Sequence, residues 1–218
     1  SMNLKNTNNL RTSIINDLNY LGKNYIFNTG LKNNINVYLK NLNAVGKNDT
    51  EYKSSPSSEL MSIFELSSEL PLEKKSETKF NKLTPKISLR FNPSDMKNYS
   101  DVGREINVDN MFNINRLAME DTLETGESLT VGLGYKIEDM TDLNKYFKFD
   151  VATVFRNEEV NEISKATTLN KKQSNIFGSL ENRFSNFWTL EYDFAVTNNL
   201  KNIEYNSINS TFSLNNFV

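Results

Sequence analysis

The sequence predicts an all-β fold of about ten strands, namely an antiparallel up-and-down transmembrane β-barrel. Apolar and polar residues alternate with period two in many segments, the pattern of strands with two different faces. The better segments have about 8 to 12 residues, close to the roughly 9 to 11 that a tilted strand needs to cross a bilayer. Long and short polar connections also alternate, as in a meander with long loops on one rim.

The first half of the chain carries the weaker alternation. We expect strands at residues 10–20, 24–30, 34–42, 60–72 and 84–91. The second half carries the clearest alternation, in "SLTVGLGYKI", "KFDVATVFR" and "WTLEYDFAVT", where one face is aliphatic or aromatic and the other small or charged. Those runs predict strands at residues 128–137, 147–156 and 188–197, and weaker patterns add 175–184 and 203–214.

The connections between these strands sort by length. Long polar stretches lie at residues 43–59, 92–127 and 157–173, and shorter ones at 73–82, 138–144 and 185–186. The links near Gly22 and Asn198 are short where strict alternation would need long ones. Residues 108–119 could place Met111, Ile114 and Ala118 on one helical face, but we expect an irregular loop there.

The two faces of the strands have different expected environments. Four charged residues occur in the middle of strands and are expected to line a water-filled lumen: Arg90, Asp150, Glu181 and Asp193. On the strand at 188–197, five residues of the other face are expected to contact lipid: Trp188, Leu190, Tyr192, Phe194 and Val196. A soluble β-sandwich stays open as an alternative, because its outer face could carry the same charges.

The composition excludes several function classes. A formal net charge of -2 gives no basic field for nucleic acid. With no histidine and no cysteine, the chain lacks the commonest general base and the thiolate nucleophile, so we predict no enzymatic activity and no cofactor. The carboxylates of Glu120, Asp121 and Glu124 lack the spacing of a Ca²⁺ loop and are interpreted as solvated loop charges.

One stretch has a more specific signature. The run "LTPKISLRFNPSDMKNYSD" is followed by "NVDNMFNINRLAMEDTLETGESLTVGLGYKI". Its features are a strand ending at Pro93, a long loop with Asn115, Arg116 and Asp121, and Gly126 before an alternating strand. This arrangement resembles the LptD family of outer-membrane lipopolysaccharide-assembly proteins. The chain departs from the family pattern at Ala118 and Met119, near an expected glycine, and at Thr122, which replaces a second arginine.

The resemblance is firmest over residues 83–212. It implies that residues 1–218 are a partial outer-membrane β-barrel domain, a barrel segment that holds about ten strands of a larger barrel. By this resemblance the protein inserts lipopolysaccharide into the outer leaflet of a Gram-negative outer membrane, without catalysis. The implied partners are lipopolysaccharide, an LptE-like plug lipoprotein and periplasmic bridge proteins. A general porin or autotransporter-type barrel, and a soluble β-sandwich binding module, are the alternatives.

The motif residues suggest a loop clasp. Arg116 and Asp121, with Asn115 and Gly126 beside them, could tie the long loop to itself or to a neighbour. Inside a barrel mouth this clasp would fold the loop over the lumen, whereas an exposed ion pair contributes only about 0 to 1 kcal/mol. Contact of Arg116 with lipopolysaccharide phosphates is the functional alternative. Gly126, Gly132 and Gly134 are expected to permit a tight turn and close strand packing.

Overall fold

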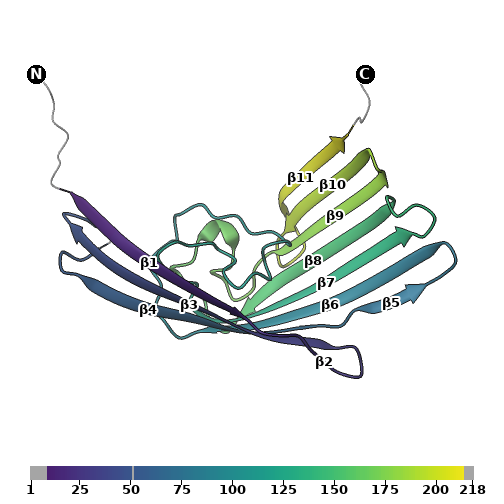
Figure 1. Cartoon of the computed structure of the whole chain (residues 1–218). Coiled ribbons are helices and arrows are strands. Elements are labelled where there is room, and N and C mark those ends of the chain that lie inside the picture. The colour runs from purple at the N-terminus through teal and green to yellow at the C-terminus, as the bar shows by residue number, and fades with distance from the viewer. Residues whose placement is uncertain (1–8, 51, 214–218) are drawn as a thin grey trace, which may run out of the picture.

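The computed structural model describes residues 9–50 and 52–213, and in this part of the chain eleven strands form one antiparallel sheet (Figure 1). The long strands follow one another in the order β1-β3-β4-β6-β7-β8-β9-β10-β11, while β2 pairs with β3 and β5 with β6. The strands are β1 (Leu10–Leu21), β2 (Tyr25–Ile26), β3 (Lys32–Lys47), β4 (Ser57–Glu69), β5 (Leu72–Lys75), β6 (Lys79–Asn92), β7 (Gly126–Asp139), β8 (Tyr146–Arg156), β9 (Ile176–Ser185), β10 (Trp188–Val196) and β11 (Ile203–Phe212).

The predicted all-β antiparallel fold is confirmed, and the sheet is open rather than closed on itself. Residues 108–119 form irregular turns, as expected, and the described residues include one short 3₁₀ turn at Lys165–Thr167. Leu214, at the end of one predicted strand, and Glu51, in one predicted loop, lie outside the described residues. Among the described residues, no helix is both long and apolar enough to cross a membrane.

The expected strand at residues 24–30 is wrong in length, because only Tyr25 and Ile26 are paired. The chain turns instead at "FNTG", where the Gly30 amide donates to the Phe27 carbonyl oxygen at 2.9 Å and Gly30 has a φ of +84°. That conformation is open to glycine at little cost. The first two long strands are therefore the arms of one hairpin, which removes the apparent irregularity near Gly22.

With this correction the connections sort onto two rims. The short-turn rim carries the links at 22–31, 70–78, 140–145 and 186–187. The long-loop rim carries those at 48–56, 93–125, 157–175 and 197–202. The links at 48–56 and 197–202 are no longer than those at 22–31 and 70–78, because β3 and β4 extend into the long loop predicted at 43–59. The predicted alternation of long and short connections therefore holds only for the long loops at 93–125 and 157–175.

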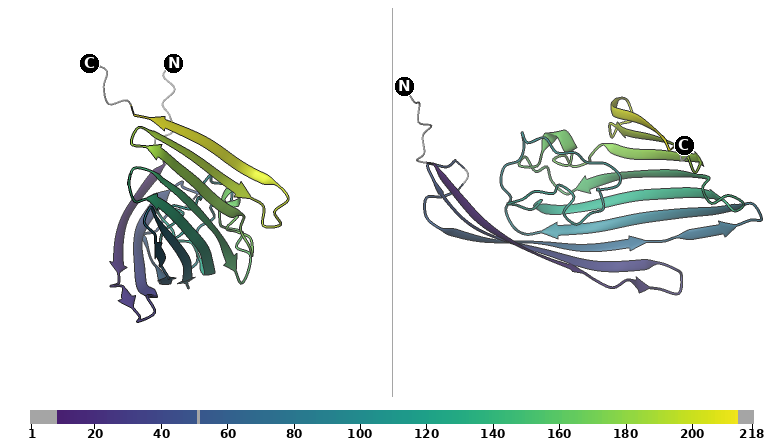
Figure 2. Two further views of the ribbon diagram at one scale, coloured as in Figure 1. Left: turned by 90° about the vertical axis from the view of Figure 1, so that its right-hand side faces the viewer. Right: turned by 45° about the horizontal axis from the view of Figure 1, so that its top comes forward.

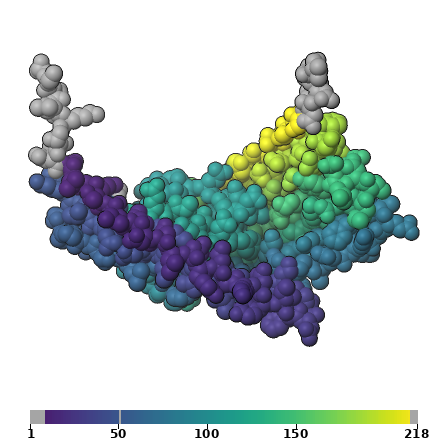
Figure 3. Space-filling view, in the orientation of Figure 1, coloured from purple at the N-terminus to yellow at the C-terminus, as the bar shows by residue number. Residues whose placement is uncertain are grey.

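The sheet is curved, and the loops at 93–125 and 157–175 lie in its concave side (Figure 2). In the space-filling view the teal atoms of the first loop fill the trough behind the purple β1 (Figure 3). The strands are also staggered: β6 pairs with β7 over its whole length, but with β4 only from Lys86 to Phe91. The free half of β4 thus continues past β6 toward the long-loop rim.

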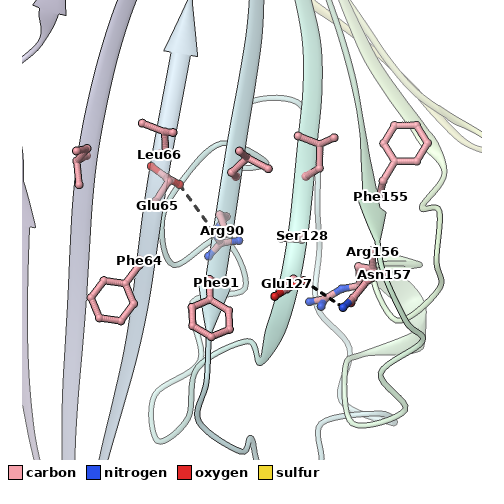
Figure 4. Close-up of a pocket in the computed structure, with 13 residues that line it drawn as sticks. Phe64, Glu65, Leu66, Arg90, Phe91, Glu127, Ser128, Phe155, Arg156 and Asn157 are labelled. Carbon is pink, nitrogen blue, oxygen red and sulfur yellow. Dashed lines mark hydrogen bonds and ion pairs between the residues drawn. The ribbon is translucent and has the colours of Figure 1, made fainter.

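Alternation along the strands separates a convex from a concave face. On β6, Ile87, Leu89 and Phe91 are exposed, whereas Ser88 and Arg90 are buried beneath the loops. The convex side of β4, β6, β7 and β8 has an apolar groove (Figure 4), lined among others by Phe64, Leu66, Phe91 and Phe155. Large apolar side chains are therefore left uncovered along the convex face, while polar ones are enclosed on the other.

Candidate functional site

A buried ionic cluster joins the long loop to the concave face of the sheet. Its centre is Glu124, two residues before β7. Arg116 donates to both carboxylate oxygens of Glu124, with 2.8 Å between Nε and Oε2. Arg156 from β8 donates to Oε1, and Arg90 from β6 donates to Oε2 at 3.3 Å. The side chains of these residues are at most 4% exposed.

A second layer of hydrogen bonds holds the cluster in place. Arg116 donates from Nη1 to the Thr130 hydroxyl at 3.0 Å and from Nη2 to the Ser128 hydroxyl at 3.2 Å, both on β7. Arg156 donates to the Thr125 carbonyl oxygen at 3.0 Å. Burial acts to raise the pKa of Glu124, but the charges of Arg116, Arg90 and Arg156 outweigh it and hold that pKa well below its ordinary value. Glu124 is therefore a carboxylate at neutral pH.

Asp121 is the centre of a second network. Its Oδ2 accepts from Lys97 Nζ at 2.9 Å and from the Tyr52 hydroxyl at 3.0 Å, and its Oδ1 accepts from the Tyr99 hydroxyl at 2.6 Å. Burial acts to raise the pKa of Asp121, but its bonds to Lys97, Tyr99 and Tyr52 keep it below its ordinary value. Burial and the bond to Asp121 raise the pKa of Tyr52 to about 12. The network ties three separate parts of the chain together.

The other motif residues have distinct places. Arg116 and Asp121 do not pair with each other, as the loop clasp would require. Arg116 pairs with Glu124, and Asp121 belongs to the separate network with Tyr52, Lys97 and Tyr99. Gly126 has a φ of +80° at the start of β7, as a tight turn requires. The Asn115 side chain hydrogen-bonds the Tyr38 hydroxyl on β3. Ala118 has a φ of +46°, a left-handed conformation near the position where the family pattern has glycine.

The interpretation of Glu124 and Asp121 as solvated loop charges is wrong, because Glu124 is 6% and Asp121 7% exposed. The composition contains a signal that could have indicated the cluster. The chain has 19 lysines and only six arginines, and three of those six converge on Glu124. Arginine is suited to buried carboxylates because its planar fork can bind both oxygens.

Two apolar clusters complete the attachment of the loops. One joins both long loops to β8, β9 and β10 through residues that include Met111, Met119, Ile163, Leu169 and Val154. The other joins Leu123 and Ile114 of the first loop to Leu42 and Ile63 on β3 and β4. The two loops also touch directly, because the Tyr99 amide donates to the Glu162 carbonyl oxygen at 2.7 Å. Together the loops form a plug over the concave face, and we call residues 93–125 and 157–175 the loop plug.

The four charged residues expected to line the lumen and the five residues expected to contact lipid lie on opposite faces of the sheet, as the alternation predicts. Arg90, Asp150, Glu181 and Asp193 share the concave face by the strand register. Arg90 is enclosed by the loop plug rather than open to water, whereas Asp150 pairs with Lys148 at 2.9 Å. The opposite face of β10 carries Trp188, Leu190, Tyr192, Phe194 and Val196. There the Trp188 ring stacks between the rings of Phe184 and Phe212, at centroid distances of 4.2 and 5.5 Å.

The polar groups of this site hold the long loop in place. Across residues 9–50 and 52–213, no group of three or more acidic side chains could hold a metal ion. Every oxygen of Glu124 and Asp121 already accepts from a protein donor. Glu124 therefore fixes the loop plug to the sheet, whereas Asp121 ties the loop plug to itself and to Tyr52 in the loop at 48–56.

Replacing Gly132 by alanine is expected to destabilise the loop plug by about 1 to 3 kcal/mol, the usual cost of overpacking. An added Cβ at Gly132 would lie 2.8 Å from the Phe112 ring of the loop and 3.0 Å from the Val151 carbonyl oxygen. The free energy of unfolding of the full-length protein measures this cost. Gly103→Ala is the control, because nothing lies within 4 Å of its added Cβ. An equal effect of both substitutions would contradict the packing argument.

Replacing Asp121 by asparagine is expected to cost about 1 to 3 kcal/mol at neutral pH, because Lys97 loses its buried partner. Since the pKa of Asp121 is lowered on folding, its contribution is present above the unfolded pKa of about 3.9 and is lost as pH falls further. Unfolding free energies measured between neutral and acidic pH should converge for the two proteins. Asp95→Asn, at an exposed position of the same loop, should leave the whole pH curve unchanged.

Comparison with known proteins agrees with the motif. The family model described as "LptD: LPS transport system D" matches residues 3–218. A search of curated proteins found no match to this chain.

Proposed function

Because this chain belongs to the LptD family of the LPS transport system, we propose that it is a partial outer-membrane β-barrel domain that takes part in inserting lipopolysaccharide into the outer leaflet. The role is passage of an amphiphile rather than catalysis. The surroundings are the outer membrane of a Gram-negative bacterium, and the partners are lipopolysaccharide, a plug lipoprotein and periplasmic bridge proteins.

The single observation that carries the membrane assignment is the contrast between the faces. Exposed large apolar side chains occupy the convex face on successive strands, for example Phe64, Leu89, Val131 and Phe155. Charged side chains in the middle of the same strands, such as Glu65, Arg90 and Asp150, point to the concave face. An uncovered apolar outside and an inside that carries the mid-strand charges are the pattern of a membrane-barrel wall, which supports the proposal. Trp188, Leu190, Tyr192, Phe194 and Val196 then face lipid, and Asp150, Glu181 and Asp193 face the lumen.

The edges of the sheet agree with a larger barrel. In the described chain, β1 and β11 each pair on one side only. Backbone groups left unpaired in hydrocarbon cost several kcal/mol each, so in a membrane both edges need a partner strand, which further strands of a larger barrel would supply. A soluble sandwich would instead need a second layer over the apolar convex face, and the described residues supply none.

The loop plug covers the concave face of this barrel segment near one rim. It fills the concave side near the long-loop rim, and extracellular loops of barrels are usually the longer ones. We therefore place the long-loop rim outside and the short-turn rim toward the periplasm. The open part of the concave face, through which a polar substrate can pass, lies on the periplasmic side of the loop plug.

Depletion of the full-length protein in its own bacterium tests this function. We expect newly made lipopolysaccharide to disappear from the cell surface and to accumulate in the inner membrane, while other outer-membrane barrels still assemble. Surface lipopolysaccharide is measured by pulse labelling and membrane fractionation. Undiminished surface delivery after depletion would refute the proposal. Re-expression of the intact protein should restore delivery.

A further inference from the structure

Four lysines lie on the open part of the concave face, between the loop plug and the short-turn rim. We call them the lysine face: Lys82 and Lys86 on β6, Lys136 on β7 and Lys148 on β8. Lys82 stands directly opposite Lys136, which stands opposite Lys148. Like charges in directly opposed positions of neighbouring strands destabilise a sheet. A row of three therefore calls for an explanation beyond folding.

Lys148 also stands opposite an acid, Glu181 on β9, but the three lysines of this row are accessible. Their side chains are 39%, 37% and 40% exposed. Each pairs with an acid on its own or an adjoining strand: Lys82 with Glu73 at 3.6 Å, Lys136 with Glu138 at 2.6 Å and Lys148 with Asp150 at 2.9 Å. Exposed ion pairs contribute little to stability, so an incoming anion can replace the acid.

Lys86 adds a cation without such a pair. The acid opposite it, Glu69, is bonded to Lys32 at 3.2 Å, and within the described chain no carboxylate lies within ion-pair distance of Lys86. Its ammonium lies 5.9 Å from the centre of the Phe112 ring. Within the described chain, Lys86 is therefore a cation without an acidic partner, at the edge of the loop plug nearer the short-turn rim.

Two hollows flank the Lys86 and Phe112 side chains. One is lined by them together with asparagines and serines, including Asn34, Asn36 and Ser68, and with two acids. These acids already have partners, because Glu65 accepts from Asn36 and Glu69 accepts from Lys32. The other hollow is lined by Lys86 and Phe112 together with Asp109, Lys148 and Asp150. Lysines bind phosphate, amides and hydroxyls bind sugar hydroxyls, and an aromatic ring packs against a sugar face. This combination fits a phosphorylated saccharide.

We propose that the lysine face binds the phosphorylated saccharide part of lipopolysaccharide on the periplasmic side of the loop plug. The inference rests on the proposed function and adds a specific contact to it. Replaceable ion pairs allow the substrate to bind and then move on, since each acid can return to its lysine. The repulsion between the opposed lysines then destabilises the sheet slightly but provides a site for transient binding of an anion.

In-cell photo-crosslinking with the full-length protein tests this site. A photoreactive amino acid replaces Asp109, an exposed residue that lines one of the hollows. We expect ultraviolet light to give an adduct that antibodies against lipopolysaccharide detect. The double substitution Lys136→Glu/Lys148→Glu should reduce the adduct at least fivefold.

The matched control is Lys74→Glu/Lys79→Glu, which makes the same change in net charge. Lys79 lies three residues before Lys82 on β6, and Lys74 on β5 pairs with Asn81, the residue next to Lys82. Both side chains therefore lie on the convex face, opposite to the lysine face. This control should leave the adduct unchanged. If the first double variant fails to reach the membrane, Lys136→Gln/Lys148→Gln removes the charges without reversing them and should reduce the adduct in the same direction.

Three results would overturn the site: an adduct of equal strength in the lysine variants, an adduct with phospholipid alone, or no adduct while surface delivery is normal. In each case the depletion experiment still decides the proposed function separately. If depletion stops surface delivery but the crosslink is absent, only the lysine face proposal fails.

Discussion

Replacing Glu124 by glutamine is expected to release the loop plug from the sheet and to destabilise the assembled protein by about 3 to 5 kcal/mol. That is the usual cost of removing one partner from a buried ionic group. Glutamine keeps the shape of the side chain but removes the carboxylate shared by Arg90, Arg116 and Arg156. The more distant acids Glu65, 3.8 Å from Arg90, and Glu158, near Arg156, offset the charges of the three arginines only in part. Their mutual repulsion then acts in a place that water does not reach.

Trypsin provides a direct measurement. Arg116 is 2% exposed in the intact protein, so the peptide bond after it is expected to be cut only when the loop opens. In isolated outer membranes the Glu124→Gln protein should be cut within the loop much faster than the parent protein. Glu120→Gln is the matched control, because Glu120 lies in the same loop and its side chain is exposed. Equal cleavage of the two variants would show that the cluster does not hold the loop.

Replacing Leu190 by arginine is expected to block membrane assembly. Leu190 lies on the convex face of β10, opposite Asn182 on β9 and Ser210 on β11. An arginine on the lipid face of a barrel costs about 2 to 4 kcal/mol near the middle of the bilayer. The amount of folded protein in the outer membrane measures the effect. Normal assembly of this variant would exclude lipid contact at this face.

The neighbouring residue supplies the control. Glu191 lies on the concave face of the same strand, opposite Glu181. Glu191→Arg should assemble normally, since the concave face of the proposed barrel meets water and the new arginine faces a carboxylate. If both variants failed equally, the sheet would be intolerant of arginine for a reason unrelated to its faces.

The strands could be predicted because the information is local. Alternation in "WTLEYDFAVT" specifies both the strand and its faces, and tertiary contacts add little to either. The turn at Asn28–Gly30 was missed because the apolar residues before it continue the alternation. Only the hydrogen bonds and positive φ of Gly30 end the pairing.

The attachment of the loop could not be predicted in the same way. The motif indicated that Arg116 and Asp121 matter for the loop, but not with which residues they pair. Arg90 and Arg156 come from different strands, and nothing local marks them as partners of Glu124. Their meeting depends on the register of β6 and β8 against β7, which places both arginines opposite Ser128. Burial of the loop depends further on apolar residues, such as Met111 and Leu169, that alternation does not mark.

The strand register and the ionic cluster together predict an order of folding. Glu124 needs partners from β6 and β8, and those strands can supply them only after β7 and β8 have paired. Contacts between distant parts of a chain form late, because loop-closure entropy must be overcome first. The loop plug can therefore close only over a finished stretch of sheet. A strand that slipped by one residue would leave the three arginines without their acid. The loop plug is therefore expected to close only when this part of the sheet has the correct register.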